Sequence, residues 1–227
     1  MSLTRADLEA DRLRKFFSEA NPGVRVLTEA EQDASLKGLL DQHRSGADVW
    51  LFGYGSLVWN PIVHHEERRV ARLHGFHRRF CLWSHLNRGS PQKPGLVLGL
   101  DTGGSCRGVA FRIAAHHAQA ELRLLWRREM VLGAYSPRWV PVDAGTETLR
   151  AITFAVNRRH PSYAGRLPFE TVIRTLVSTR GHLGTPVEYL LKTVRGLIEH
   201  GVRDSYLIEL RKRVLAVHPE LAAAHAH

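Results

Sequence analysis

Apolar positions change their spacing along the chain, and the first stretch has helical spacing. Up to about residue 47, large apolar side chains recur every three or four residues, beginning with Leu8, Leu13, Phe16 and Phe17. Asn21-Pro22-Gly23 interrupts this pattern. Thr28 followed by Glu31 has the spacing of a capping box, which opens helices. The sequence therefore predicts two helices here, packed as an extension on the main domain.

Short apolar runs separated by glycine follow, and they predict strands. The expected strands cover 49–52, 96–100, 107–113, 139–142 and 151–156, with a turn at 101–104. A hairpin is expected around His74-Gly75, joining 69–73 to 76–83. Helical periodicity interrupts the strands once, over 118–129.

After residue 161 the pattern is helical, with predicted helices over 169–179, 187–198 and 204–217. Strands first and helices later, with one helix inserted, predict an α+β fold on a curled antiparallel or mixed sheet. The expected division is a helical extension over 1–47, a main domain over 48–217 and a frayed tail over 218–227.

Composition narrows the class of protein. The chain has 227 residues, and no apolar run approaches the ~18 residues of a membrane span. Its first twenty residues are interleaved with charge, unlike a secretory signal. Two cysteines, Cys81 and Cys106, are too few for a disulfide framework or a cysteine-based zinc cluster. The histidines lack the spacing of metal ligands. A cytoplasmic protein without a metal is expected.

The net charge of +10 raises the possibility of a nucleic-acid partner. The basic residues are spread along the chain, and the densest stretch, ERRVARLHGFHRRF, alternates charge with apolar residues as a half-solvated strand pair would. No helix-turn-helix, zinc-finger or aromatic RNA-binding pattern is present. A solvated basic face is favoured over a nucleic-acid groove, and a small anionic substrate would need only one or two of the arginines.

The segment LFGYGSLVWN places two glycines directly after a predicted buried strand. The backbone of Tyr54, Gly55, Ser56 and Leu57 could present several N–H groups to a carboxylate or a developing oxyanion. The dinucleotide-binding fingerprint is excluded because its third glycine would fall at Val58. An ordinary glycine turn between strands is the alternative reading of the same residues.

Glu129 is the candidate for proton transfer. It ends a predicted amphipathic helix, where partial burial and the negative end of the helix dipole would both raise its pKa. Arg127 or Arg128 would lower the pKa if either lay close. From the residues alone, a surface glutamate paired with one of these arginines remains the alternative.

Successive segments of this sequence resemble the motifs of the ChaC family of γ-glutamylcyclotransferases. In order, they are LFGYGSLVWNP, RRFCLWSHLNRGSPQKPGLVLGL, CRGVAFRI, LWRREM and HPSYAG. The resemblance runs from about residue 49 to about residue 211. It implies a small sheet curled toward a barrel, with a cavity at the end of the first strand.

The resemblance also implies roles for individual residues. Glu129 matches the family's catalytic glutamate, Arg88 lies in the segment near the substrate, and Tyr163 would point into the site. The implied reaction cleaves glutathione, or another γ-glutamyl amine, to 5-oxoproline and the remaining amine without a cofactor. The alternative is a protein of the same fold that binds a small anion or regulates and has lost the chemistry. Ser56 is expected to be a donor in the loop rather than a nucleophile, since YGSL is not the Gly-x-Ser-x-Gly elbow.

Overall fold

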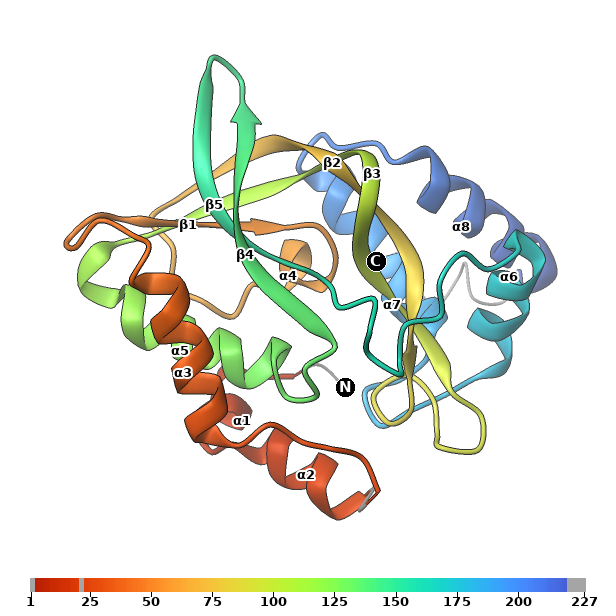
Figure 1. The fold of residues 1–227 in the computed structure, drawn as a ribbon. Helices are drawn as coiled ribbons and strands as arrows, with labels where there is room; N and C mark the ends of the chain where they lie inside the picture. The colour runs from red at the N-terminus through yellow and green to blue at the C-terminus, as the bar shows by residue number, and fades with distance from the viewer. Residues whose placement is uncertain (1–2, 21–22, 220–227) are drawn as a thin grey trace.

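The computed structural model describes residues 3–20 and 23–219, and their centre is a closed five-stranded barrel (Figure 1). The strands are β1 (Val49–Gly53), β2 (Glu67–Ser84), β3 (Gly95–Ile113), β4 (Tyr135–Ala144) and β5 (Glu147–Val156). They are joined in the order β1-β3-β2-β4-β5. Neighbouring pairs are antiparallel except for β1–β5 and β3–β5, which are parallel. The expected curled mixed sheet is confirmed as a barrel.

Strands β2 and β3 are longer than the sequence predicted. They pair antiparallel from Glu67–Arg112 to Ser84–Gly95, so the expected hairpin at His74-Gly75 and the expected turn at 101–104 are both wrong. Gly75, Gly103 and Gly104 have positive φ, a backbone conformation that glycine adopts without steric cost. The glycines therefore form an irregularity inside two continuous strands, where the register shifts, and do not end either strand.

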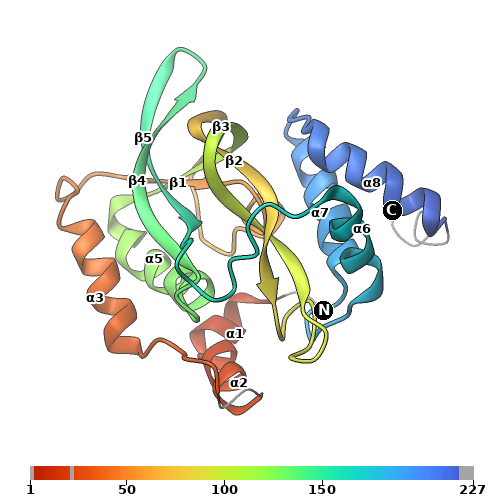
Figure 2. The same cartoon turned by 45° about the vertical axis from the view of Figure 1, so that its right-hand side comes forward.

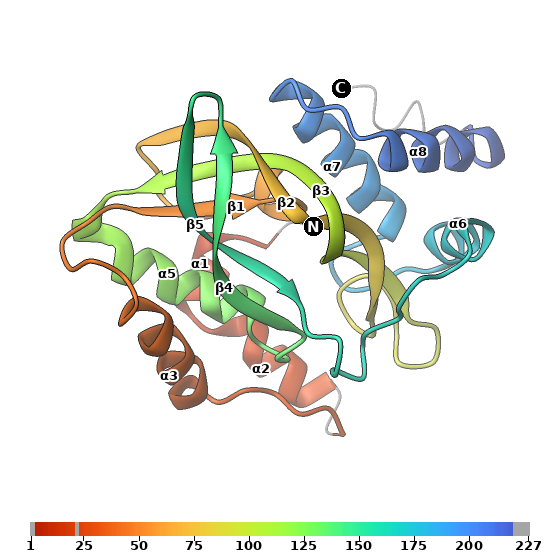
Figure 3. The same ribbon diagram turned by 45° about the horizontal axis from the view of Figure 1, so that its top comes forward.

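Helices lie on two sides of the barrel, as a second view shows (Figure 2). On one side are α6 (Phe169–Ser178), α7 (Pro186–Glu199) and α8 (Ser205–Val217), close to the predicted bounds. On the other side α5 (Ala115–Glu129) packs beside the N-terminal helices (Figure 3). A short helix, α4 (Ser56–Trp59), follows β1 and packs on α7. No helix of the described residues is long and apolar enough to cross a membrane.

The described residues of the N-terminal extension form three helices, α1 (Arg5–Glu9), α2 (Arg12–Ala20) and α3 (Glu29–Leu40), where two were predicted. The first predicted helix is interrupted because Asp11 has a φ of 52°. The predicted capping box at Thr28 and Glu31 is confirmed at the start of α3. Of the predicted break at Asn21-Pro22-Gly23, only Gly23 is described, and of the predicted tail, residues 220–227 lie outside the described part.

The extension packs firmly on the main domain. Trp126 and Trp139 each donate an indole N–H to α3, to the Ser35 hydroxyl at 3.2 Å and to the Leu39 carbonyl at 2.9 Å. Leu8, Leu13 and Phe17 are buried in a cluster with Leu86, Leu124 and Val131 of the main domain. Apolar burial and directed hydrogen bonds thus fix the three helices against the barrel and α5.

Candidate active site

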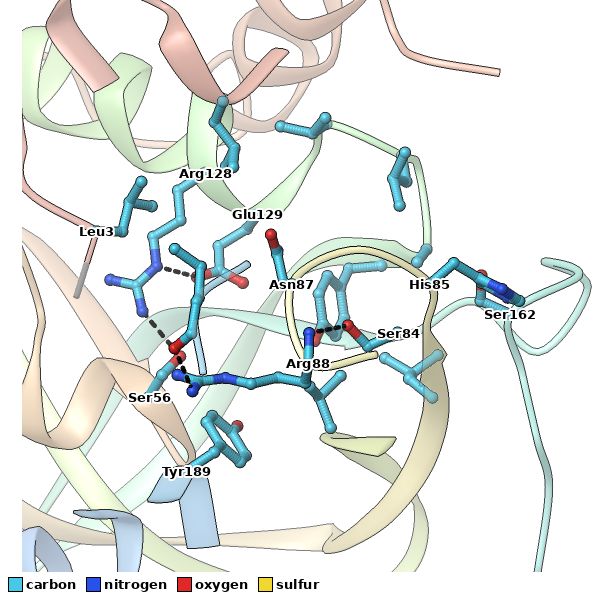
Figure 4. Close-up of a pocket in the computed structure, with 18 of the residues that line it drawn as sticks. Leu3, Ser56, Ser84, His85, Asn87, Arg88, Arg128, Glu129, Ser162 and Tyr189 are labelled. Carbon is cyan, nitrogen blue, oxygen red and sulfur yellow. Dashed lines mark hydrogen bonds and ion pairs between the residues drawn. The ribbon is translucent and has the colours of Figure 1, made fainter. Parts of the chain in front are cut away.

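A cavity of about 170 Å³ lies between the start of α4, the end of α5 and the loop from β2 to β3. Three of the residues selected from the sequence line it, Ser56, Arg88 and Glu129. They come from segments far apart in the chain, and Figure 4 shows them around a shared space. The cavity also receives apolar side chains from the barrel, from the segment after α5 and from the N-terminal extension.

Ser56 reaches the cavity because the chain turns sharply after β1. A Cβ atom at Gly55 would lie 2.9 Å from the Tyr189 hydroxyl oxygen, so glycine lets the turn approach α7 closely. The Ser56 backbone N–H lies near that hydroxyl and opposes the rise in the pKa of Tyr189 that burial causes. The serine Oγ faces α5 and accepts a hydrogen bond of 2.8 Å from Arg128. The Ser56 side chain is therefore held by the neighbour of the candidate acid.

Glu129 is the last residue of α5, and its side chain is 12% exposed. Its Oε1 lies 3.0 Å from Nε of Arg128. The same guanidinium donates to Ser56 Oγ and to the Asn60 carbonyl, so Arg128 joins the end of α5 to the turn after β1 (Figure 4). Arg127 points elsewhere, donating to the Leu8 and Glu9 carbonyls. Of the two arginines weighed from sequence, Arg128 is the close one.

Burial raises the pKa of Glu129 above its usual 4.5, and the nearby charge of Arg128 opposes this without cancelling it. The sequence left open which of these opposing effects on the pKa is larger, and in the structure it is burial. Three buried tyrosines are affected by the charge of this carboxyl. Desolvation raises the pKa of Tyr54 and Tyr135, and it raises that of Tyr189 to about 12. These phenols stay protonated near neutral pH, so the neutral hydroxyls of Tyr135 and Tyr189 border a single nearly buried carboxyl.

Arg88 is held in the cavity wall by the backbone opposite it. Its Nη1 donates to the Leu183 carbonyl at 2.6 Å and to the Thr185 carbonyl at 3.3 Å. Its guanidinium carbon lies 5.5 Å from the centre of the Tyr189 ring. Burial lowers the pKa of Arg88 from its usual 12.5, and a guanidinium remains protonated in proteins at neutral pH. A fixed cation that lines a cavity is suited to binding a carboxylate.

The structure does not bring every predicted residue to the cavity. Tyr54 is buried under the turn, where its hydroxyl donates to the Phe154 carbonyl at 2.8 Å. Gly55 and Leu57 flank Ser56 but do not line the cavity. Tyr163, expected to point into the site, does not line this cavity, and its hydroxyl donates to Asp101 at 2.8 Å. That buried carboxylate needs donors, and Tyr163 supplies one.

Sequence reasoning missed two residues that the fold brings here. Tyr189 was part of an amphipathic helix with no motif around it, yet it contacts both the Ser56 turn and Arg88. Asn87 precedes Arg88 and lines the cavity. Its buried Oδ1 accepts no hydrogen bond from the described residues. An orphan acceptor beside a carboxylate suits a ligand that carries N–H groups, and only the RGSPQKPG motif next to it could have drawn attention to Asn87.

This arrangement can bind a zwitterion and move a proton. Arg88 supplies positive charge, Asn87 an acceptor, and Ser56 and Tyr189 hydroxyl groups, while Glu129 supplies a carboxyl with a raised pKa. Within residues 3–20 and 23–219, no cluster of three or more His, Cys, Asp or Glu side chains is placed to hold a metal ion.

Sequence comparison gives a consistent set of relatives. Residues 49–217 match the profile of the family described as ChaC-like protein. The chain is 38% identical over 187 residues to the glutathione-specific gamma-glutamylcyclotransferase of Escherichia coli, covering 82% of this chain and 81% of that protein. It is 36% identical to the human glutathione-specific gamma-glutamylcyclotransferase 1, covering 63% of this chain and 67% of the relative.

Comparison of folds points the same way. The crystal structure of a yeast gamma-glutamylcyclotransferase specific to glutathione superposes with a TM-score of 0.68. The match covers 74% of this chain and 96% of the yeast protein at 23% identity. At that identity the likeness concerns the fold alone.

Proposed function

The chain belongs to the ChaC-like protein family, and on that premise we propose that it is a γ-glutamylcyclotransferase that cleaves glutathione. The products are 5-oxoproline and Cys-Gly. The observation that carries the proposal is the convergence of Glu129 and Ser56 on one cavity, through the guanidinium of Arg128. Residues 48–217 form the catalytic domain in this proposal.

The proposed reaction is an intramolecular aminolysis. The α-amine of the γ-glutamyl group attacks its own γ-carbonyl carbon, and the new C–N bond closes a five-membered lactam. The amide bond to the cysteinyl nitrogen then breaks. Because the amine enters as an ammonium with a pKa of about 8, a base must accept a proton from it, and the leaving nitrogen must receive one.

Glu129 performs both proton transfers in this proposal. Its carboxylate accepts the first proton from the ammonium, and the resulting acid gives it to the cysteinyl nitrogen as the amide bond breaks. The regenerated carboxylate accepts the second proton from the ring nitrogen, which becomes the lactam N–H, and passes it to the released amine, which leaves as an ammonium. The raised pKa of Glu129 suits both steps, since a carboxyl of ordinary acidity would be a weaker base. No water is consumed, and a nearly buried carboxyl with apolar neighbours is consistent with that.

The remaining residues bind the substrate and stabilise charge. We assign the α-carboxylate to Arg88 and the α-ammonium to Asn87 and Glu129. The Ser56 backbone N–H and the Tyr189 hydroxyl are the candidate donors to the oxyanion. Tyr54 supports the turn from beneath.

The rest of the chain fits a cytoplasmic enzyme. The two cysteines, Cys81 and Cys106, are both free and buried, as expected for a reducing compartment. Since the cavity is small and already contains a fixed carboxylate and cations, a small-molecule substrate is favoured over a nucleic acid.

The test is a product analysis with the purified protein. Glutathione is expected to give equimolar 5-oxoproline and Cys-Gly, and Glu129→Gln to release both about 10³-fold more slowly. N-acetylglutathione, whose nucleophilic amine is blocked, is expected to remain intact. Release of glutamate instead would indicate hydrolysis. Tight binding of glutathione without any product would favour a non-catalytic protein, and faster turnover of γ-glutamylalanine would move the preferred substrate away from glutathione.

A further inference from the structure

The N-terminal extension supplies one side of the cavity. Leu3, Leu13 and Phe17 line it together with Ser56 and Glu129. All three precede residue 49, where the match to the family begins. Figure 4 shows Leu3 on the Arg128 side of the space. We call Leu3, Leu13 and Phe17 the N-terminal wall.

Polar contacts hold this wall in place. Arg5 forms a two-pronged ion pair with Glu121 of α5, with N–O distances of 2.7 and 2.9 Å. The Leu3 carbonyl accepts a hydrogen bond of 3.0 Å from the Asn60 side chain. The Asn60 carbonyl in turn accepts from Arg128. The wall is therefore tied to the same guanidinium that contacts Glu129.

The wall differs chemically from the rest of the cavity. The charged and hydrogen-bonding side chains, among them Arg88, Arg128 and Glu129, all come from the main domain. From the described residues of the extension, the side chains that line the cavity are all apolar. A γ-glutamyl head carries an ammonium and a carboxylate, which need the polar side. The part of the substrate that can face an apolar wall is the uncharged side chain of its second residue.

Resting on the proposed function, we propose that the N-terminal wall determines specificity for the second residue of the substrate. It selects γ-glutamyl compounds whose second residue has a small, uncharged side chain, such as the CH₂SH of cysteine. Apolar contact with Leu3 and Phe17 favours this group, and their bulk excludes longer side chains. The segment outside the family match thus acts as a specificity element of the site.

Two adjacent phenylalanines provide a matched test. Phe17 lines the cavity, whereas Phe16 stacks on His182 with ring centres 4.4 Å apart and does not line it. The wild type, Phe17→Ala and Phe16→Ala are compared with glutathione and with S-propylglutathione, whose second residue is three carbons longer. The measured quantity is the ratio of kcat/KM for the two compounds, which does not depend on the fraction of protein that is folded.

The wild type is expected to prefer glutathione, and Phe17→Ala to reduce that preference about ten-fold, as room for a few methylene groups is opened. Phe16→Ala should keep the wild-type ratio. Leu3→Ala, at a less buried position, should shift the ratio in the same direction as Phe17→Ala. A wild type without preference, or the same ratio in all variants, would overturn the proposal.

Binding separates this proposal from the proposed function. The dissociation constants of both compounds are measured by calorimetry in the Glu129→Gln background, with and without Phe17→Ala. If the wild type releases no 5-oxoproline but Phe17→Ala still weakens the binding preference for glutathione, the proposed reaction is refuted and the role of the N-terminal wall is retained. A preference that Phe17→Ala leaves unchanged, or no binding of either compound, would refute the wall.

Discussion

Glu121 and Glu129 lie eight residues apart on α5, and both side chains are nearly buried, at 4% and 12% exposure. Glu121 accepts two hydrogen bonds from the Arg5 fork and one from the His64 backbone N–H. These donors lower its pKa despite its burial. Glu129 has Arg128 beside it, and its pKa is raised by burial.

The difference shows that burial alone does not decide the state of a carboxylate. Desolvation acts on both residues, and the number of donors around each determines the direction of the shift. Glu121 is compensated and anchors the extension, a structural role. Glu129 receives too few donors to offset its desolvation, and it lies beside a cavity. A buried carboxyl of this kind favours function at a cost in stability.

The largest expected effect is on turnover. Glu129→Gln should lower kcat with glutathione by about 10³-fold, since one group serves as both base and acid. The kcat of Glu121→Gln should stay within about ten-fold of the wild-type value, because Glu121 contacts Arg5 and does not line the cavity. Steady-state 5-oxoproline release measures both variants, and equal losses would contradict the division of roles.

In stability the order of Glu129→Gln and Glu121→Gln should be reversed, with the larger loss in Glu121→Gln. Glu121→Gln leaves the Arg5 guanidinium without its carboxylate and should lower the free energy of unfolding by about 2 kcal/mol at pH 7. Because the folded-state pKa of Glu121 is lowered, its stabilisation is present above the unfolded-state pKa and is lost as the pH falls through the folded one. Urea unfolding at pH 7 and at pH 3 measures both effects. A pH-independent loss would contradict this account.

Glu129→Gln should instead leave the protein as stable or more stable, by about 1 kcal/mol at neutral pH. The folded-state pKa of Glu129 is raised, so its favourable contribution is complete below the unfolded-state pKa and is lost as the pH rises through the folded one. The advantage of the glutamine should therefore grow from pH 4 to pH 7. Thermal unfolding across that range tests this, and a marked destabilisation at pH 7 would show that Glu129 is compensated after all.

The smallest expected effect concerns the position of a pH profile. Arg128→Met removes the charge that opposes the rise in the pKa of Glu129, so the acid limb of kcat/KM should move to higher pH. Arg123→Met is the control on the same helix, since Arg123 pairs with Asp33 at the surface. An unmoved limb in Arg128→Met would separate that limb from Glu129.

Much of the fold was predictable because hydrophobic periodicity reflects the local backbone. The helices after residue 168 and the strands at 139–142 and 151–156 lie inside the observed elements or within a residue of their ends. The errors came where glycine signals have more than one structural outcome. Gly75 predicts a turn in the sequence, but β2 pairs with β3 on both sides of it, so the strand continues through this residue.

Part of the site was predictable for a related reason. Glu129 stood out because it ends an amphipathic helix, and Ser56 because it follows a strand and two glycines. Tyr189 could not be selected, since nothing in its neighbours along the chain marks it. Asn87 lies within the segment RRFCLWSHLNRGSPQKPGLVLGL, but an amide there carries no chemical signal of its own. The hydrogen bond from Tyr163 to Asp101 could not be predicted, since the two residues are 62 positions apart in the chain.

The sequence by itself determined most of the helices and the buried strands, since these depend on residues close together in the chain. Together with the family resemblance, it also selected Glu129 and the turn at Ser56 as candidates. Only the tertiary structure decided which arginine lies against Glu129, how many donors each buried glutamate receives, and that the N-terminal segment lines the cavity. Those outcomes depend on contacts between residues distant in sequence, and the free energy of burying a group is set by the neighbours that packing brings to it.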